Sequence, residues 1–215
     1  RKGSKRLKNK NILKFKNKPL ITFTIEAAIK SKIFHNIYVS SDCEKIKNIC
    51  KKFKEVTFIQ REARLSNSKA TINDVCLDLL KKQKNISDLK YFTVLYATSP
   101  LRNYLDIRNC FRKLKTQDLD SIIAVTKFFY PPFQALLKKK NLYKPMFKKH
   151  INLKSNQFEN KIFVDAGSMY MSKISVFKNK KTFYTQKLGG YYMDQNKSID
   201  IDYYTDYLRL IKYNR

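Results

Sequence analysis

Within the first 125 residues, segments whose apolar positions have helical spacing alternate with short apolar runs that are typical of strands. Helical spacing over 20–30 puts Ile21, Ile25, Ala28 and Ile29 on one face. The same reasoning predicts further helices over 43–53, 71–82 and 104–114, and strands over 37–39, 56–59, 92–96 and 122–125. The repeated strand-helix-strand order predicts a doubly wound α/β domain with a mostly parallel sheet.

The regular alternation stops after Val125. Tyr130-Pro131-Pro132 ends regular structure, and residues 133–161 are polar, Lys-rich and weakly patterned. Short strands are then predicted over 162–164, 169–171 and 191–193, before a closing helix over 203–213. We interpret residues 1–215 as a single domain with a small arm inserted at about 130–165, and we expect this arm to form the contact of a homodimer.

The composition is that of a folded chain, because 43% of the 215 residues are hydrophobic and can form a core. No apolar run approaches the roughly 18–20 residues of a membrane-spanning helix, so no membrane contact is expected. The four cysteines are widely separated and include no C-x-x-C pair. This spacing argues against a disulfide framework or a zinc ribbon and predicts a cytoplasmic location. The chain has two histidines, and so low a number argues against a His-rich metal site or a Ser-His-Asp triad.

The charge is strongly positive, with 46 Lys and Arg against 17 Asp and Glu, a formal net charge of +29. Such a balance first suggests a nucleic-acid partner. However, 9 of the basic residues are Arg and 37 are Lys, scattered over every segment, whereas base reading favours Arg. We interpret most of the Lys residues as solvated surface and expect no specific nucleic acid, with a basic nucleic-acid-binding module as the alternative. A further interpretation is that the positive charge attracts an anionic substrate such as a nucleoside triphosphate.

The most basic stretch of the chain is its beginning, Arg1 to Arg6, which contains Gly3-Ser4. A Gly-Ser turn can direct successive backbone N–H groups at an anion, and Lys5 and Lys10 would add positive charge. Ligands of open α/β sheets bind at the carboxyl ends of strands, so the stretch is a candidate phosphate site. It fits neither a Walker A loop nor a G-x-G-x-x-G fingerprint, and a solvated basic terminus is the alternative interpretation.

Two acidic residues near the end of the chain form a second candidate site. In extended chain, Asp200 and Asp202 lie on one face about 7 Å apart, while Ile199 and Ile201 face the core. Paired carboxylates can hold a hard cation such as Mg²⁺. The alternative is a polar strand end that caps the following helix.

Thr98-Ser99-Pro100 follows the predicted strand over 92–96, so its hydroxyls would lie at the carboxyl edge of the sheet. An ordinary helix N-cap is the alternative for this turn. The polar loop over 66–71 would lie at the same edge.

Taken together and in order, these motifs resemble those of the cytidylyltransferases that make CMP-activated nonulosonic acids (sialic, legionaminic and pseudaminic). The opening pattern A-R-x-G-S-K-R-[IL]-x-x-K-N is similar to residues 1–11, and K-P-L-I-x-x-[ST]-I-E-A-A to residues 18–28. The remaining motifs are V-S-[ST]-D at 39–42, T-[AS]-P-[LF] at 98–101, D-A-G at 165–167 and D-I-D at 200–202. The resemblance covers nearly the whole chain and implies a Rossmann-like nucleotidyltransferase fold.

The resemblance also implies a role for the residues of each motif. CTP would be held by Arg1, Gly3, Ser4, Lys5, Lys10, Asn11 and Thr71. The sugar would contact Tyr96, Thr98, Ser99, Gln157 and Asp165. Mg²⁺ would be bound by Asp200 and Asp202. The residues assigned to catalysis itself would be Lys10, Arg1 and Asp202.

The reaction that the resemblance implies is attack by the anomeric hydroxyl of the sugar on the α-phosphorus of CTP, with loss of pyrophosphate, for surface glycan biosynthesis. It needs no enzyme nucleophile, which agrees with the lack of a triad. Tyr96-Ala97-Thr98 and Asp165-Ala166-Gly167 are more similar to the pseudaminic acid enzymes, whereas 99–102 and 198–202 are closer to the sialic acid branch. We favour pseudaminic acid, with N-acetylneuraminic acid, legionaminic acid and 3-deoxy-octulosonate as alternatives.

The chain departs from the family pattern at several places. Lys2 replaces a loop glycine, Ser68 replaces an aspartate, and an arginine usual near 155–158 is absent. Because of these departures, a catalytically inactive relative of the family is an alternative interpretation. We also expect a first strand to precede Arg1.

Overall fold

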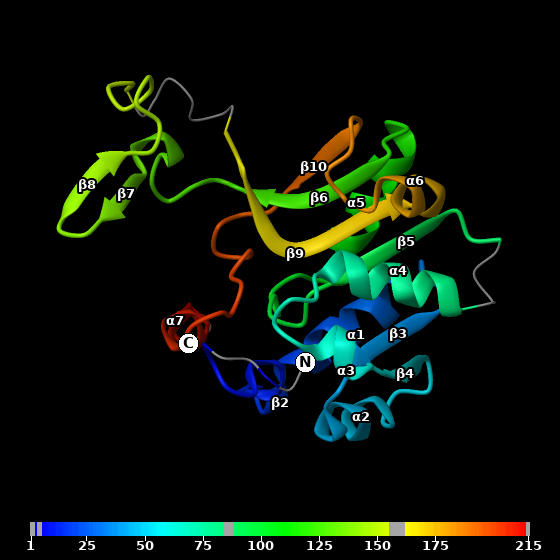
Figure 1. The fold of residues 1–215 in the computed structure, drawn as a ribbon. Helices are drawn as coiled ribbons and strands as arrows, with labels where there is room; N and C mark the ends of the chain where they lie inside the picture. The colour runs from blue at the N-terminus through cyan, green and yellow to red at the C-terminus, as the bar shows by residue number, and fades with distance from the viewer. Residues whose placement is uncertain (1–2, 4–5, 84–87, 155–161, 214–215) are drawn as a thin grey trace.

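The computed structural model describes residue 3 and residues 6–83, 88–154 and 162–213. The helices are η1 (Lys10–Ile12), α1 (Leu20–Ser31), α2 (Glu44–Cys50), α3 (Ala63–Ser66), α4 (Ile72–Lys82), α5 (Tyr104–Thr116), η3 (Pro132–Gln134), α6 (Ile174–Lys180) and α7 (Tyr204–Tyr213). The strands are β1 (Lys14–Phe15), β2 (Lys18–Pro19), β3 (Ile37–Ser41), β4 (Val56–Gln60), β5 (Tyr91–Leu95), β6 (Ser121–Thr126), β7 (Leu136–Lys139), β8 (Leu142–Pro145), β9 (Val164–Lys173) and β10 (Leu188–Tyr192). Their arrangement confirms the predicted α/β class (Figure 1).

The central sheet has the order β10-β6-β9-β5, and β3 and β4 form a separate parallel pair. Strand β9 is antiparallel to both β5 and β6, so the main sheet is mixed, with β10 and β6 as its parallel pair. The predicted strand over 169–171 lies within the longer strand β9, whereas of the strand predicted over 162–164 only Val164 belongs to β9 and residues 162–163 precede it. Gly167 lies within it at a φ of 59°, a left-handed conformation that glycine adopts without strain.

Helices cover both faces of the central sheet, as a doubly wound domain requires. On one face, Ile107, Cys110 and Leu114 of α5 pack with Met169 and Met171 of β9. On the other face, α4 and α6 pack against alternate residues of the same strands, with Phe177 fully buried. Because successive side chains of a strand point to opposite faces, both cores draw on β5 and β9. None of the described helices is long and apolar enough to cross a membrane.

The segment predicted as an arm holds a β-hairpin. Strands β7 and β8 pair antiparallel, with Lys139 opposite Leu142. Figure 1 shows the hairpin projecting away from the helices and the central sheet. Large apolar side chains on it are exposed, among them Leu142 at 68% and Tyr143 at 60%. The weak pattern of this stretch reflects a hairpin that buries little of its own apolar surface.

The aromatic packing beneath β5 gives a test of the core. Replacing Phe177 by Ala should lower the free energy of unfolding by about 3–5 kcal/mol, because the ring fills space against Phe92 and Phe183 at centroid distances of 4.8 and 4.7 Å. Urea denaturation of the purified protein measures this change. The matched control, Leu105→Ala at an exposed leucine of α5, should change stability by no more than about 0.5 kcal/mol. Equal losses in the two variants would contradict this description of the core.

Candidate active site

A cavity of about 590 Å³ lies between β3 and β5, and all residues of both strands line it. Its polar mouth is at the carboxyl ends of these strands, beside Arg61, which directly follows β4. Five predicted site residues line the cavity: Lys10, Asn11, Thr71, Tyr96 and Thr98. They come from three segments far apart in sequence, the N-terminal segment, the start of α4 and the end of β5. The structure therefore brings the predicted nucleotide and sugar contacts to the edge of the sheet where α/β proteins bind ligands.

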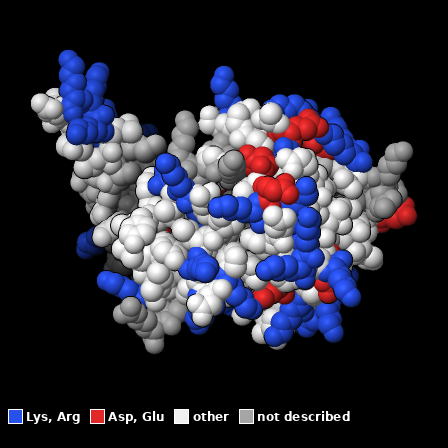
Figure 2. Space-filling view, turned by 90° about the horizontal axis from the view of Figure 1, so that it is seen from below, with Lys and Arg blue, Asp and Glu red and all other residues white. Residues whose placement is uncertain are grey.

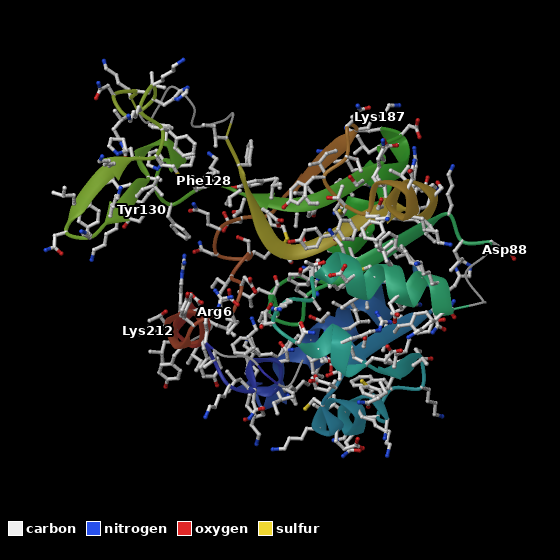
Figure 3. All side chains as sticks on the ribbon, in the orientation of Figure 1. Arg6, Asp88, Phe128, Tyr130, Lys187 and Lys212 are labelled. Atoms are coloured by element: carbon white, nitrogen blue, oxygen red, sulfur yellow. The ribbon has the colours of Figure 1, made fainter. Side chains whose placement is uncertain are left out.

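Ion pairs connect the N-terminal segment to the segment that follows β10. Lys10 Nζ donates to Asp202 Oδ1 at 2.5 Å, and an Arg6 guanidinium nitrogen lies 2.6 Å from Asp202 Oδ2. Arg6 also lies over the ring of Tyr203 at 5.1 Å, next to α7 as Figure 3 shows. A predicted catalytic lysine and a predicted metal ligand, 192 residues apart, thus share one site.

Asp200 occupies a more enclosed position than Asp202. The backbone N–H of Ile201 donates to the carbonyl of Thr98 at 2.9 Å, which places Asp200 beside the turn after β5. A Cβ at Gly167 would lie 2.9 Å from Asp200 Oδ2, so the glycine is needed for this approach as well as for its φ. Burial raises the pKa of Asp200, against a hydrogen bond with Thr98 and the charge of Lys10.

The Asp200 and Asp202 carboxylates fit a hard cation. The Oδ1 atom of Asp200 is buried and has no hydrogen-bond partner among the described residues. An uncompensated carboxylate oxygen of this kind is what an ion such as Mg²⁺ coordinates. Because no cluster of three His, Cys, Asp or Glu side chains occurs in the described part of the chain, an ion here would take its other ligands from water or substrate oxygens.

A second polar cluster surrounds Asp165 on β9. Its carboxylate accepts hydrogen bonds from the Tyr170 hydroxyl at 2.9 Å, the Tyr184 hydroxyl at 2.7 Å and the Gly167 N–H at 2.9 Å. The rings of Tyr96 and Tyr170 are 5.4 Å apart. Burial, with the charge of Asp165, raises the pKa of Tyr96 to about 12, so its hydroxyl keeps its proton at neutral pH. The cluster offers hydroxyl donors beside the cavity.

Ser99 does not face the cavity. It is fully buried, and its hydroxyl donates to Ser168 Oγ at 2.8 Å. Arg102, 2% exposed, lies behind it and donates to the Ser168 carbonyl at 2.6 Å and to Thr24 Oγ1 at 2.9 Å. Burial lowers the pKa of Arg102 to about 10, with the charge of Asp106 acting in the opposite direction. The buried hydrogen bonds of Ser99 and Arg102 therefore stabilise the turn after β5, and Ser99 contributes to its packing.

Sequence reasoning missed Arg61, which also lines the cavity. It follows β4 directly, and a guanidinium nitrogen donates to the Ser40 carbonyl at 2.6 Å while Nε donates to Ser40 Oγ at 3.1 Å. These bonds fix the side chain at the end of β3. The sequence signal that could have indicated Arg61 is its position: it is one of the 9 arginines, and it follows the carboxyl end of a predicted parallel strand.

Thr71 has a structural role in addition to its place in the cavity wall. Its Oγ1 accepts from the Asp74 N–H at 3.2 Å, and Asp74 Oδ2 accepts from the Thr71 N–H at 2.8 Å, which forms a capping box at the start of α4.

Gly3 is exposed, and no described residue lies within 4 Å of the position that a Cβ would take. Four predicted site residues lie outside the described residues: Arg1, Ser4, Lys5 and Gln157.

Lys10 and Arg61 in the wall of the cavity, with the carboxylate of Asp202 paired to Lys10, suit an anionic ligand at the carboxyl edge of the sheet. Residues 1–212 match the family model described as Cytidylyltransferase, and the chain belongs to that family. It is 30% identical over 204 residues to the pseudaminic acid cytidylyltransferase of Campylobacter jejuni, a match that covers 93% of this chain and 87% of that protein.

Other relatives are longer than the matched region. The chain is 30% identical to a Helicobacter pylori protein named pseudaminic acid cytidylyltransferase and UDP-2,4-diacetamido-2,4,6-trideoxy-beta-L-altropyranose hydrolase, with 86% of this chain and 36% of that protein covered. It is 28% identical to the N-acylneuraminate cytidylyltransferase of Streptococcus agalactiae, with 98% and 51% covered. The chain therefore spans about a third and about half of these two relatives.

Solved structures support the fold. The structure of a CMP:2-keto-3-deoxy-manno-octonic acid synthetase complexed with CTP aligns with a TM-score of 0.69 at 12% identity, covering 99% of this chain and 95% of that one. A 4-diphosphocytidyl-2C-methyl-D-erythritol synthase from Anaerococcus prevotii aligns with a TM-score of 0.69 at 10% identity, covering 94% and 88%. At these identities the likeness concerns the arrangement of helices and strands.

The buried carboxylate of Asp200 predicts a characteristic pH dependence of stability. Because its pKa is raised on folding, the folded state holds the proton more tightly, and stability declines as pH rises from the unfolded pKa through the folded one. Without divalent cations, Asp200→Asn should therefore increase the free energy of unfolding at pH 8 by about 1–3 kcal/mol. The gain should disappear near pH 4, where the carboxyl is protonated.

Urea denaturation in EDTA over this pH range measures the effect. Exposed Glu55 is the matched control, because Glu55→Gln removes the same charge from the surface. A gain in Asp200→Asn that did not vary with pH would argue against a buried, charged Asp200.

Proposed function

We propose that this protein transfers CMP from CTP to the anomeric hydroxyl of a nonulosonic acid and releases pyrophosphate, with pseudaminic acid as the favoured sugar. One observation carries the proposal most directly: in a chain of the cytidylyltransferase family, Lys10 of the cavity wall is joined to Asp202, next to half-buried Asp200. Cations for a triphosphate and carboxylates for a divalent ion thus lie together at one sheet edge.

The residues of the cavity suit a reaction that depends on positioning and charge. Lys10 and Arg61 bring positive charge to the place proposed for the CTP phosphates, and Asn11 lies beside them in the wall. The sugar hydroxyl oxygen forms the new bond to the α-phosphorus, the bond from the α-phosphorus to the bridging oxygen breaks, pyrophosphate leaves with that electron pair, and the hydroxyl proton passes to solvent water. Fixed charges that neutralise the transferring phosphate stabilise such a transition state without an enzyme nucleophile.

Mg²⁺ is the proposed cofactor. Asp200 and Asp202 would hold it, and the ion would supply polarisation of the α-phosphate oxygens. No described residue donates a hydrogen bond to the buried Oδ1 of Asp200, which supports this assignment.

The sugar would lie against the aromatic cluster at the start of β9. Tyr96 and Asp165 offer a hydroxyl donor and carboxylate acceptors, the chemistry that recognises hydroxyl and N-acyl groups. The Campylobacter and Helicobacter relatives favour pseudaminic acid. The Streptococcus relative, at 28% identity, favours N-acetylneuraminic acid as the alternative, and legionaminic acid is a further one.

The surface charge does not favour a nucleic-acid partner. Figure 2 shows Lys and Arg spread over the whole viewed face, with acidic residues among them. Nucleic-acid sites concentrate such residues in a stripe or patch. We further propose a cytoplasmic location, because the four cysteines are free and buried, as in proteins of reducing compartments.

The first experiment is a pyrophosphate-release assay on the full-length protein with CTP and Mg²⁺, comparing pseudaminic, legionaminic and N-acetylneuraminic acids. Release with pseudaminic acid is expected. In Asp202→Asn, turnover should fall about 100- to 1000-fold, because a charge that acts on the transferring phosphate group is removed. Glu55→Gln is the control, and circular dichroism checks that both variants fold. An Asp202→Asn enzyme with normal turnover would refute the assigned role.

The arm leads to a separate proposal, that the protein is a homodimer joined through β7 and β8. Leu142 and Tyr143, two of its exposed apolar residues, would be covered by the partner. Light scattering should give twice the mass of the chain, and the double substitution Leu142→Asp with Tyr143→Asp should give the monomer. Leu105→Asp, at an exposed leucine on α5, should leave the mass unchanged. A monomer mass for the unchanged protein would contradict the proposal.

A further inference from the structure

The carboxylate of Asp106 is buried away from the cavity, and the proposed reaction gives it no role. Asp106 lies in the first turn of α5 and is 5% exposed. Its Oδ2 accepts from the Asn103 N–H at 2.8 Å as part of the capping box of the helix, and its Oδ1 accepts from the Tyr191 hydroxyl at 3.2 Å. These donors are neutral, and a buried carboxylate is costly unless a cation is paired with it.

That cation is Lys197, which comes from the segment between β10 and α7 in Figure 1. Lys197 Nζ lies 2.7 Å from each of the two carboxylate oxygens of Asp106. Removal of one member of such a pair is strongly destabilising, because the buried charge that remains is uncompensated. The start of α5 therefore holds Lys197 at a fixed place, although the two residues are 91 positions apart in the sequence.

Lys197 belongs to a turn over residues 195–198, which we call the anchored turn. The Lys197 N–H donates to the carbonyl of Asp194 at 3.0 Å, which closes the turn. Gln195 Nε2 donates at 3.1 Å to each of the carbonyls of 127 and 128, just beyond β6. The turn is thus fixed on one side by an amide and on the other by the ion pair with α5.

Asp200 follows the anchored turn directly. Its neighbours Ile199 and Ile201 are 6% and 0% exposed, and the Ile201 N–H donates to the Thr98 carbonyl at 2.9 Å. Burial of the two isoleucines makes Asp200 face away from the core, but apolar packing is non-directional. A charged hydrogen-bonded pair has a defined geometry, so the pair of Lys197 can fix the position of this segment along its own direction.

We propose that Asp106 and Lys197 are positioning residues for the divalent cation: their ion pair fixes the anchored turn, and the turn fixes Asp200 where its buried Oδ1 meets the ion. The inference rests on the proposed function, which assigns the cation to Asp200 and Asp202. Neither member of the pair lines the cavity, so both act through Asp200. Ligands that are already held in place bind an ion more tightly than ligands that must first be ordered.

The first measurement needs neither a metal nor a substrate. In Lys197→Met the side chain keeps its length and loses its charge, and amide hydrogen exchange over 198–202 should become about 10-fold faster. Lys197→Arg restores the pair and should return exchange to nearly its original rate. Unchanged exchange over 198–202 in Lys197→Met would overturn the inference.

The matched control is Lys173→Met. Lys173 is also partly buried and pairs with Asp118 at 2.8 Å, but it lies at the other end of the sheet, opposite Tyr91 at the start of β5. Its loss should leave exchange over 198–202 unchanged. An equal acceleration in Lys173→Met and Lys197→Met would show a general loss of stability and would overturn the inference.

The second measurement is Mn²⁺ binding by water-proton relaxation, with CTP present and sugar absent, so that no turnover takes place. Lys197→Met should weaken Mn²⁺ binding about 3- to 30-fold, and Lys197→Arg should recover most of the loss. Asp106→Asn should weaken it as well, and the double variant Asp106→Asn with Lys197→Met should bind about as weakly as either single variant. Lys173→Met should bind like the unchanged protein.

The two ways of failing are distinguishable. Equal Mn²⁺ binding by Lys197→Met and the unchanged protein would overturn the positioning role and leave the proposed function intact. An unchanged protein that bound no Mn²⁺ with CTP would refute the metal assignment of the proposed function, and this inference with it, before any variant is compared.

Discussion

The buried guanidinium of Arg102 is the contact on which the geometry of the site depends. It donates to the Ser168 carbonyl on β9 at 2.6 Å and to Thr24 on α1 at 2.9 Å, and it lies within 3.4 Å of the Tyr96 carbonyl. Burying an arginine that has no ion pair with a described carboxylate is costly, and the carbonyl and hydroxyl acceptors bound by its two terminal nitrogens offset part of that cost. These hydrogen bonds fix the separation of β5, β9 and α1 at the cavity mouth.

The antiparallel direction of β9 determines which residues reach this mouth. Because β9 runs against β5, its first residues lie at the carboxyl end of β5, where the Tyr96 N–H donates to the Ser168 carbonyl at 3.0 Å. Asp165 and Gly167 are therefore placed next to Tyr96. In a parallel arrangement the same residues would lie at the opposite edge. Because Gly167 has no Cβ, Asp200 has room to approach.

Local patterns predicted the helices and strands up to Val125 well, because amphipathic spacing and capping are encoded within each segment. The direction of β9 could not be predicted this way, since it depends on how the arm returns the chain to the sheet. For the site, the motif resemblance located Lys10 and Asp202, whereas Arg61 and Arg102 were missed. Their roles arise from contacts with Ser40 and Ser168, and such distant contacts leave no periodic signal in a single sequence.

The two aspartates of the D-I-D motif have opposite electrostatic surroundings, and this contrast suits the proposed reaction. Asp202 is neutralised by Lys10 and Arg6, while Asp200 has a buried oxygen that no residue in the described part of the chain pairs with. A divalent cation entering alone would compete with Lys10 for Asp202. A triphosphate entering with the cation would offer Lys10 a new anionic partner, so each charge would remain compensated. The same pairing explains why the lysine can lie at the mouth before substrate binds without leaving a buried charge uncompensated.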